Sequence, residues 1–184
     1  MIKIAIIGTH CVGKTTLALE LATVIADGGT SVELLAEVAR GCPFPINEEA
    51  TQEAFYWILA RQLQLEVEKS THADVLICDR SVLDNFVYYA RLFGTTGEEA
   101  EAFNTFCKSW MKTYDLIVRL PISFSLRDDR YRSLNIRFQH EIDELFDQLV
   151  ESEYGSDTHP MYVRGPLSAR DIVKIMTPFL NDSK

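Results

Sequence analysis

The sequence predicts an α/β fold in which helices cover both faces of a five-stranded parallel sheet, giving a three-layer sandwich. Two observations predict it. Short apolar runs alternate with longer stretches of helical spacing along the 184 residues, and the first run is almost entirely apolar, as in a strand buried on both faces. The length suits one compact domain, residues 1–184, and we find no repeat or linker that would divide it.

Five short apolar runs are the expected strands, and segments with helical periodicity separate them. The expected strands cover residues 2–7, 32–36, 75–78, 116–120 and 161–163, and the expected helices cover residues 14–26, 48–69, 82–93, 98–111 and 137–153. The helix at 82–93 has a further signal, because Ser81 with Asp84 three residues later matches a capping box.

The overall charge limits the classes of partner. The chain carries 18 Lys and Arg against 27 Asp and Glu, a formal net charge of -9 at pH 7. This charge repels a nucleic acid backbone at long range and so disfavours long DNA or RNA as a partner. The apolar N-terminal run is too short for a signal peptide or a membrane span, and the four cysteines form no CxxC pair. We therefore expect a cytoplasmic protein with no membrane partner.

Residues 8–15 match the motif G-x-x-x-x-G-K-[ST], and they lie between an expected strand and an expected helix. Glycines at both ends let backbone N–H groups turn toward a phosphate, and the helix N-terminus adds its dipole. Lys14 supplies a positive charge for the β- and γ-phosphates, and Thr15 supplies a hydroxyl for Mg²⁺. The sequence thus predicts ATP and Mg²⁺ as cofactors, bound by Gly8, Thr9, His10, Cys11, Val12, Gly13, Lys14, Thr15 and Thr16.

The third expected strand leads into Asp79-Arg80-Ser81 at the carboxyl edge of the sheet, where open α/β folds bind ligands. A carboxylate at that edge can help to hold the metal ion, and Arg80 can neutralise charge on a transferred phosphoryl group or position the acceptor. The alternative is an Asp–Arg ion pair that only caps the following helix.

The second expected strand leads into Glu37 and Arg40, which would lie beside the glycine motif if the first two strands are close in the sheet. Glu37 could accept the proton of a substrate hydroxyl, with Arg40 beside it in the substrate site. A solvated glutamate at a strand end, paired with Arg40, explains the same residues without catalysis.

Two further segments are candidates for ligand contacts. In the helix at 48–69, Gln52 could read the edge of a planar base, although the same helix also fits a plain core helix. Between the fourth strand and the last long helix, Arg127, Arg130 and Arg132 concentrate basic charge in an otherwise acidic chain. This segment, around residues 125–137, suits a lid that covers the phosphates and excludes water, and a solvated run of charges is the alternative.

The segments GTHCVGKTT, LLAEVAR, VLICDRSVLDNFVYYAR and RDDRYR resemble those of the P-loop kinases of nucleosides and nucleotides, over most of the chain. The DRS tripeptide before a Tyr-containing helix is similar to deoxynucleoside kinases, and GTH-x-x-GKTT with E-x-A-R is similar to the AAA-type kinase-like domains that include nicotinamide riboside kinases. The resemblance implies a P-loop NTPase fold, for which we expect the strand order 2-3-1-4-5. It also implies roles for individual residues: Lys14 on the phosphates, Thr15 and Asp79 near Mg²⁺, Glu37 as acceptor base, Arg80 near the acceptor, Gln52 in the acceptor pocket, and Arg127, Arg130 and Arg132 in the lid.

The predicted function is transfer of the γ-phosphoryl group of ATP to a small nucleoside-like or nucleotide-like acceptor. The alternatives are a kinase of hydroxymethylated pyrimidine in phage-type DNA, which the net charge disfavours, and a nucleotide-binding ATPase or switch module. We find no guanine-reading N-K-x-D sequence, and Arg80 follows Asp79 where many ATPases carry a second acid. Both features favour transfer to a bound acceptor. The helix at 82–93 could also pair two subunits in a homodimer.

Overall fold

The structure is a computed structural model that describes residues 1–123, 133–151 and 161–182. Its five strands form one sheet in which every pair is parallel, in the order β2-β3-β1-β4-β5. This confirms the predicted fold class and strand order. The strands are β1 (Ile2–Ile7), β2 (Val32–Leu35), β3 (Val75–Asp79), β4 (Leu116–Arg119) and β5 (Met161–Arg164).

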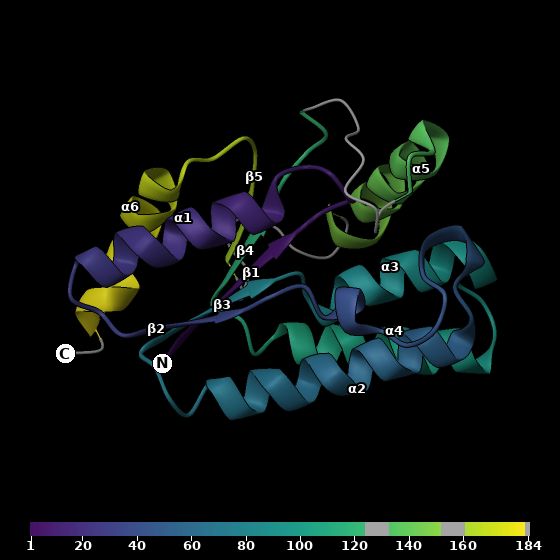
Figure 1. The fold of residues 1–184 in the computed structure, drawn as a ribbon, viewed down its shortest axis with the longest axis horizontal. Helices are drawn as coiled ribbons and strands as arrows, with labels where there is room; N and C mark the ends of the chain where they lie inside the picture. The colour runs from purple at the N-terminus through teal and green to yellow at the C-terminus, as the bar shows by residue number, and fades with distance from the viewer. Residues whose placement is uncertain (124–132, 152–160, 183–184) are drawn as a thin grey trace.

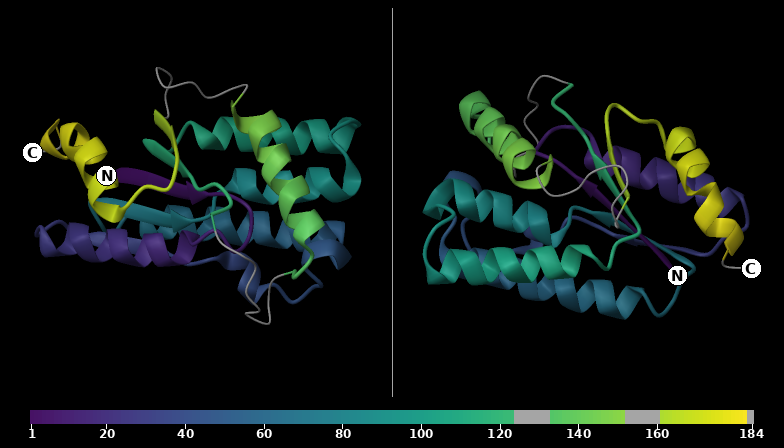
Figure 2. Two further views of the ribbon diagram at one scale, coloured as in Figure 1. Left: turned by 90° about the horizontal axis from the view of Figure 1, so that it is seen from above. Right: turned by 180° about the vertical axis from the view of Figure 1, so that it is seen from behind.

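Helices cover both faces of the sheet (Figure 1). The helices are α1 (Lys14–Asp27), α2 (Gln52–Lys69), α3 (Val82–Phe93), α4 (Glu98–Met111), α5 (Ile136–Phe146) and α6 (Ala169–Asp182). Helices α1 and α6 pack together on one side of the strands, and α2, α3 and α4 lie on the other, as the views of Figures 1 and 2 show. Helix α5 packs against α3 on this second side.

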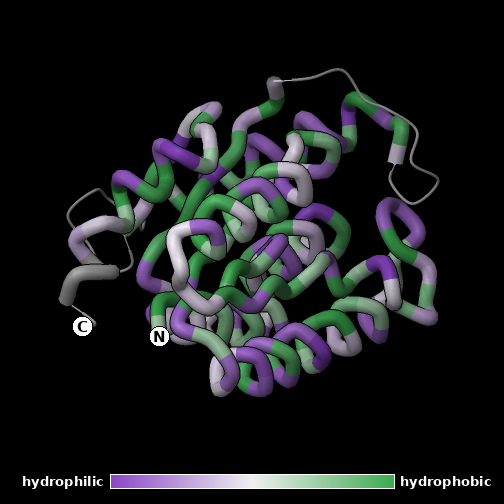
Figure 3. Tube along the Cα trace, turned by 60° about the vertical axis from the view of Figure 1, so that its left-hand side comes forward, coloured by the Kyte–Doolittle hydropathy of each residue, from purple (hydrophilic) through white to green (hydrophobic). Residues whose placement is uncertain are grey.

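The sheet separates two hydrophobic cores, and its central strand β1 contributes residues to both. Ile2, Ile4 and Ile6 face the core under α1 and α6, whereas Ala5 and Ile7 face the core under α2 to α5. This alternation follows from the two-residue period of a strand, and both faces are apolar because both are covered. Figure 3 shows hydrophilic and hydrophobic residues interleaved around the helical turns, as expected of helices that each bury one face.

Some element boundaries differ from those expected. The helix predicted at 48–69 begins at Gln52, because Ala50 and Thr51 are extended and separate it from the short 3-10 turn η2 (Asn47–Glu49). The helix predicted at 137–153 changes after Phe146 to a π-helical turn, η3 (Asp147–Glu151), and residues 152 and 153 lie outside the described ranges. Helix α6 was not expected from the sequence.

The connection from β3 to α3 is short and well ordered by hydrogen bonds. Ser81 is the N-cap of α3, and its hydroxyl accepts from the backbone N–H groups of Leu83 and Asp84, while Asp84 accepts from the backbone of Ser81. This confirms the predicted capping box. The same carboxylate accepts a hydrogen bond from the backbone N–H of Gly8, at 3.2 Å, and so joins the start of α3 to the glycine turn.

Helix α3 does not offer the open face on which a homodimer was expected. Eight of its twelve residues are buried, and it packs against α2, α4 and α5. The burial of this helix therefore gives no support to a dimer through it. Within the described ranges, no helix combines the length and the apolar character needed to cross a membrane.

The two serine caps of this fold provide a first prediction. We expect Ser81→Ala to lower the free energy of unfolding by about 1 to 2 kcal/mol, because the lost hydroxyl leaves two buried N–H groups and a buried carboxylate short of a partner. Ser168 and Asp171 form the same pattern of hydrogen bonds before α6 but are exposed to solvent. We expect Ser168→Ala to cost less, since water can replace the hydroxyl. Urea unfolding of both variants measures the difference, and equal losses would contradict the assigned role of burial.

Candidate active site

The glycine motif forms a tight turn between β1 and α1. Its backbone has positive φ at Gly8 (144°), Cys11 (59°) and Gly13 (89°). A Cβ at Gly8 would lie 2.7 Å from the carbonyl oxygen of Leu120, so only glycine fits there. The N-cap of α1 is Gly13, which has no side chain with which to cap the helix. The turn therefore has the form of an anion site at a helix N-terminus.

The side chain of Lys14 is folded back onto this turn. Lys14 is only 2% exposed, and its Nζ donates to the carbonyl oxygens of Gly8 (2.8 Å) and Thr9 (2.6 Å). Burial lowers the pKa of the Lys14 ammonium from 10.5 to about 7, and the cation of Arg80 adds to the shift against the opposing effect of nearby carboxylates. An anion bound in the turn would favour the charged ammonium.

The side chains of Thr9 and His10 in the turn are buried and face the protein interior. The side-chain amide of Gln139 on α5 donates to the carbonyl oxygen of His10 at 2.7 Å. The backbone carbonyl oxygen of Gln139 accepts from the Thr9 hydroxyl at 3.1 Å. The His10 ring lies 3.0 Å from the Tyr88 hydroxyl. These contacts hold the turn in place, so its contribution to ligand binding would come from its backbone together with Lys14 and Thr15.

The two residues predicted to hold a metal ion lie together. The Thr15 hydroxyl donates to Asp79 Oδ2 at 2.5 Å. Asp79 is 1% exposed, and its other oxygen, Oδ1, has no hydrogen-bond partner among the described residues. Hydroxyl and carboxylate oxygens are the ligands that Mg²⁺ prefers, and a buried carboxylate oxygen with no partner fits a cation site at this point.

Glu37 and Arg80 meet at the carboxyl edge of the sheet, where β2 lies beside β3 and not beside β1. Glu37 precedes the short 3-10 turn η1 (Val38–Gly41), and its side chain is 6% exposed. Its Oε1 accepts from Arg80 Nε at 2.7 Å, and its Oε2 accepts from Arg40 Nε at 3.1 Å. The guanidinium of Arg80 also lies over the ring of Tyr88, 5.4 Å from its centre.

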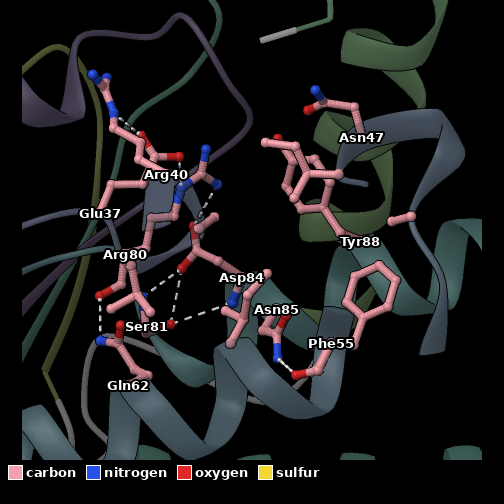
Figure 4. A pocket seen from close by; sticks show the side chains of 15 residues that line it. Glu37, Arg40, Asn47, Phe55, Gln62, Arg80, Ser81, Asp84, Asn85 and Tyr88 are labelled. Carbon is pink, nitrogen blue, oxygen red and sulfur yellow. Dashed lines mark hydrogen bonds and ion pairs between the residues drawn. The ribbon is translucent and has the colours of Figure 1, made fainter. Parts of the chain in front are cut away.

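A pocket opens beside this ion pair (Figure 4). Its empty volume, counted together with the solvent at its mouth, is about 720 Å³. Polar and apolar side chains from η1, η2, α2 and α3 line it. They are Glu37, Val38, Ala39, Arg40, Ile46, Asn47, Ala50, Phe55, Ile58, Gln62, Arg80, Ser81, Asp84, Asn85 and Tyr88.

The structure brings most of the predicted residues together, with two exceptions. Gln52 lies at the first turn of α2, outside the pocket lining, where its amide donates to Glu99 of α4 at 3.0 Å. The three lid arginines Arg127, Arg130 and Arg132 lie outside the described residues, so the lid stays a prediction.

Sequence reasoning missed several residues of the pocket wall. Asn85 and Tyr88 lie on α3 at four and seven positions after Ser81, a helical spacing that places them on the face that begins with the DRS tripeptide. From this spacing, Asn85 and Tyr88 could have been predicted to line the pocket. Gln62 is 3% exposed and lies on a helix whose pattern gave no reason to prefer it over other polar positions.

The sheet order, the glycine turn and the residues at the carboxyl edge together define a P-loop domain. The sequence model of the AAA domain matches residues 3–165, and the chain belongs to this family. A search of curated proteins found no match.

Solved structures with the same fold include two of deoxyadenosine kinase from M. mycoides. One, with the products dCMP and a flexible dCDP bound, has a TM-score of 0.61 at 16% identity and covers 100% of both chains. The other, with bound dATP, has a TM-score of 0.61 at 18% identity and covers 98% of this chain and 100% of that one. NadR in complex with NAD and AMP-PNP has a TM-score of 0.66 at 19% identity over 96% of this chain and 49% of NadR. At these identities the likeness shows a shared fold.

The lowered pKa of Lys14 leads to a second prediction. At about pH 8.5 the free protein holds Lys14 mostly neutral, and a bound polyphosphate such as ATP raises its pKa again, so binding should take up close to one proton. At about pH 6 Lys14 is already charged, and the uptake at Lys14 should vanish. Calorimetric titration in buffers of different ionisation enthalpy measures the protons exchanged.

The matched control is Lys14→Arg, which keeps a permanent cation at this position. We expect this variant to show no proton uptake at about pH 8.5. The same binding heat in all buffers for the unmodified protein would contradict the low pKa of Lys14.

Proposed function

We propose that this protein is an ATP-dependent phosphotransferase that moves the γ-phosphoryl group of ATP to a hydroxyl of a small nucleoside-like acceptor. One observation carries the proposal: the glycine turn and the pocket share a wall. Asp84 lines the pocket and accepts a hydrogen bond from Gly8 in the turn, and Arg80, which also lines the pocket, lies close enough to Lys14 to affect its pKa. A donor bound in the turn would thus point its terminal phosphate toward an acceptor in the pocket.

On the donor side, backbone N–H groups of the turn and the N-terminus of α1 would bind the phosphates, and Lys14 would neutralise their charge. Thr15 and Asp79 would hold Mg²⁺, which supplies further charge neutralisation at the phosphate oxygens. Gln139 and Asp84 already hold the turn in one conformation, so ligand binding would not carry the entropy cost of ordering it.

On the acceptor side, Glu37 would take the proton of the acceptor hydroxyl. The hydroxyl oxygen then forms a bond to the γ-phosphorus as the bond between that phosphorus and the bridging oxygen of ADP breaks. Arg80 and Arg40 hold the Glu37 carboxylate through both of its oxygens, which fixes its direction. Arg80 would also stabilise negative charge that develops on the transferred group.

Transfer fits the site better than slow hydrolysis by a switch module. The residue after Asp79 is an arginine that pairs with Glu37, and the pocket beside it has a partly apolar wall. A hydrolase needs room for one water molecule at this position, whereas a transferase needs a shaped pocket for a second substrate. The lid arginines Arg127, Arg130 and Arg132 would complete the donor site and exclude water.

A third prediction concerns the metal ion. We expect Asp79→Asn to reduce by about tenfold the gain in ATP affinity that Mg²⁺ brings, and to leave Mg²⁺-free binding no weaker, since a negative charge is removed beside the phosphates. The control is Asp74→Asn, because Asp74 precedes the same strand at its opposite end and pairs with Ser31. Titration of ATP with and without Mg²⁺ tests this, and an unchanged gain in Asp79→Asn would remove Asp79 from the metal site.

A fourth prediction tests Glu37 as the base. We expect Glu37→Gln to lower kcat of phosphoryl transfer by about 100-fold or more while the Kd of ATP changes little, because the amide cannot accept the proton. Glu33→Gln is the matched control, since Glu33 lies on β2 and pairs with Lys69 on the surface. The assay measures ATP consumption with nucleosides, nucleoside monophosphates, nicotinamide riboside and DNA that contains hydroxymethylated pyrimidine. Equal losses of kcat and ATP affinity in Glu37→Gln would argue against the role, and acceptor-independent hydrolysis alone would favour the switch module.

A further inference from the structure

The carboxylate of Glu37 lies between two guanidinium groups, as Figure 4 shows. Its Oε1 accepts a hydrogen bond from Arg80 Nε at 2.7 Å, and its Oε2 accepts one from Arg40 Nε at 3.1 Å. Cations beside a carboxylate favour its charged form and so weaken it as a base. In the free site, the residue proposed to take the acceptor's proton is therefore restrained by a cation on each oxygen.

One of these two cations is firmly fixed. The side chain of Arg80 is 13% exposed, and its guanidinium also lies 3.8 Å from the carboxylate of Asp84 and over the ring of Tyr88. Arg80 could move away from Glu37 only by giving up these contacts as well. A buried charge that loses its partners is strongly unfavourable, so the contact of Arg80 with Oε1 persists when a ligand binds.

The other cation is held much less firmly. The side chain of Arg40 is 41% exposed, and it pairs with a glutamate only three residues earlier in the chain. An exposed guanidinium can exchange such a contact for water at small cost. Arg40 also lines the pocket, so a group bound there can reach the oxygen that Arg40 occupies. Oε2 is thus the oxygen of Glu37 that an incoming hydroxyl can take over.

We propose that Arg40 restrains Glu37 as a base until the acceptor hydroxyl replaces it at Oε2. This inference rests on the proposed function, because it concerns the same base. While Arg40 holds Oε2, a water molecule in the pocket is poorly activated, and ATP in the glycine turn is preserved. When the acceptor binds, its hydroxyl donates to Oε2, Arg40 turns to solvent, and Glu37 becomes more basic. Arg40 is a positioning residue, since it acts through Glu37.

The reaction that Arg40 suppresses is the hydrolysis of ATP. In that reaction a water molecule gives one proton to Glu37, and its oxygen forms a bond to the γ-phosphorus. The bond from this phosphorus to the bridging oxygen of ADP breaks, which yields ADP and phosphate. Hydrolysis and transfer thus use the same base and differ in the molecule that reaches it.

Other groups around Glu37 do not offer the same control. Lys14 at the start of α1 and Tyr88 on α3 interact with Glu37 electrostatically, in addition to the two arginines. Of these four residues, Lys14 is buried, Arg80 and Tyr88 are partly buried, and Arg40 is exposed. Release of the base therefore falls to Arg40.

The test measures acceptor-independent hydrolysis of ATP with Mg²⁺. We expect Arg40→Gln to raise kcat of hydrolysis by about fivefold and to leave KM of ATP nearly unchanged. Arg40→Lys should stay close to the unmodified protein, because the contact with Oε2 uses a single donor nitrogen that an ammonium can replace. Arg61→Gln is the control, since Arg61 is bonded to Gln64 on the surface of α2. Unchanged or slower hydrolysis in Arg40→Gln would overturn the proposal.

A double variant shows whether the increase passes through Glu37. Hydrolysis by Arg40→Gln combined with Glu37→Gln should equal that of Glu37→Gln alone, because the released carboxylate is then absent. A general loosening of the site would raise hydrolysis whether or not Glu37 is present. Faster hydrolysis that persists in the double variant would therefore also overturn the proposal.

The hydrolysis assay needs no acceptor and so separates this proposal from the proposed function. Glu37-dependent hydrolysis that rises in Arg40→Gln, with no transfer to any nucleoside tested, would support the role of Arg40 and contradict the kinase. Transfer to a nucleoside together with unchanged hydrolysis in Arg40→Gln would support the kinase and contradict the role of Arg40.

Discussion

The carboxylate of Asp84 is the point on which the candidate site depends. It is 1% exposed, and its two oxygens serve different parts of the structure. Oδ2 accepts from the backbone and the hydroxyl of Ser81 and so begins α3, while Oδ1 accepts from Gly8 and lies 3.8 Å from Arg80. Burial raises the pKa of Asp84, whereas Arg80 and Lys14 lower it, so the charged form depends on these cations. The buried carboxylate of Asp84 thus positions the glycine turn, the start of α3 and the side chain of Arg80 relative to one another.

The backbone of Arg80 carries the second constraint. Its φ of 85° is unfavourable for a residue with a side chain, and such a conformation persists only where the surroundings hold it. The N–H of Arg80 donates to Ile6 in the central strand, and its carbonyl accepts from Gln62. The guanidinium is held by Glu37. The kink ends strand pairing directly after Asp79 and turns the next side chain toward the pocket, which explains why two adjacent residues can serve a metal site and an acceptor site.

The sheet could be predicted from the sequence because the patterns that indicate it are local. The apolar runs, the glycine motif and the Ser81–Asp84 pair each specify structure over a few residues, and the carboxyl edge then follows from parallel pairing. The pocket wall was less predictable, and α2 shows why. Gln62 and Glu66 are polar yet buried, so the periodicity of the helix marks them as surface positions. Gln52, ten residues before Gln62, lies on a different side of the helix and contacts α4. The register of a helix against a pocket depends on distant partners such as Lys3 and Tyr114, which no local pattern reveals.

The net charge of -9 and the proposed binding of a polyphosphate are compatible because they act over different distances. The net charge governs long-range encounter with a polyanion, and screening weakens it beyond about 10 Å. A small ligand in the site is affected by the nearest groups instead. There Lys14, Arg80 and Arg40 lie at the carboxyl edge with the N-terminus of α1. Arg119 at the end of β4 is buried, and Asp143 and Asp147 compensate its charge. Glu37 and Asp84 are paired with Arg80 and Arg40, so a phosphate approaching the turn meets N–H groups and an ammonium first.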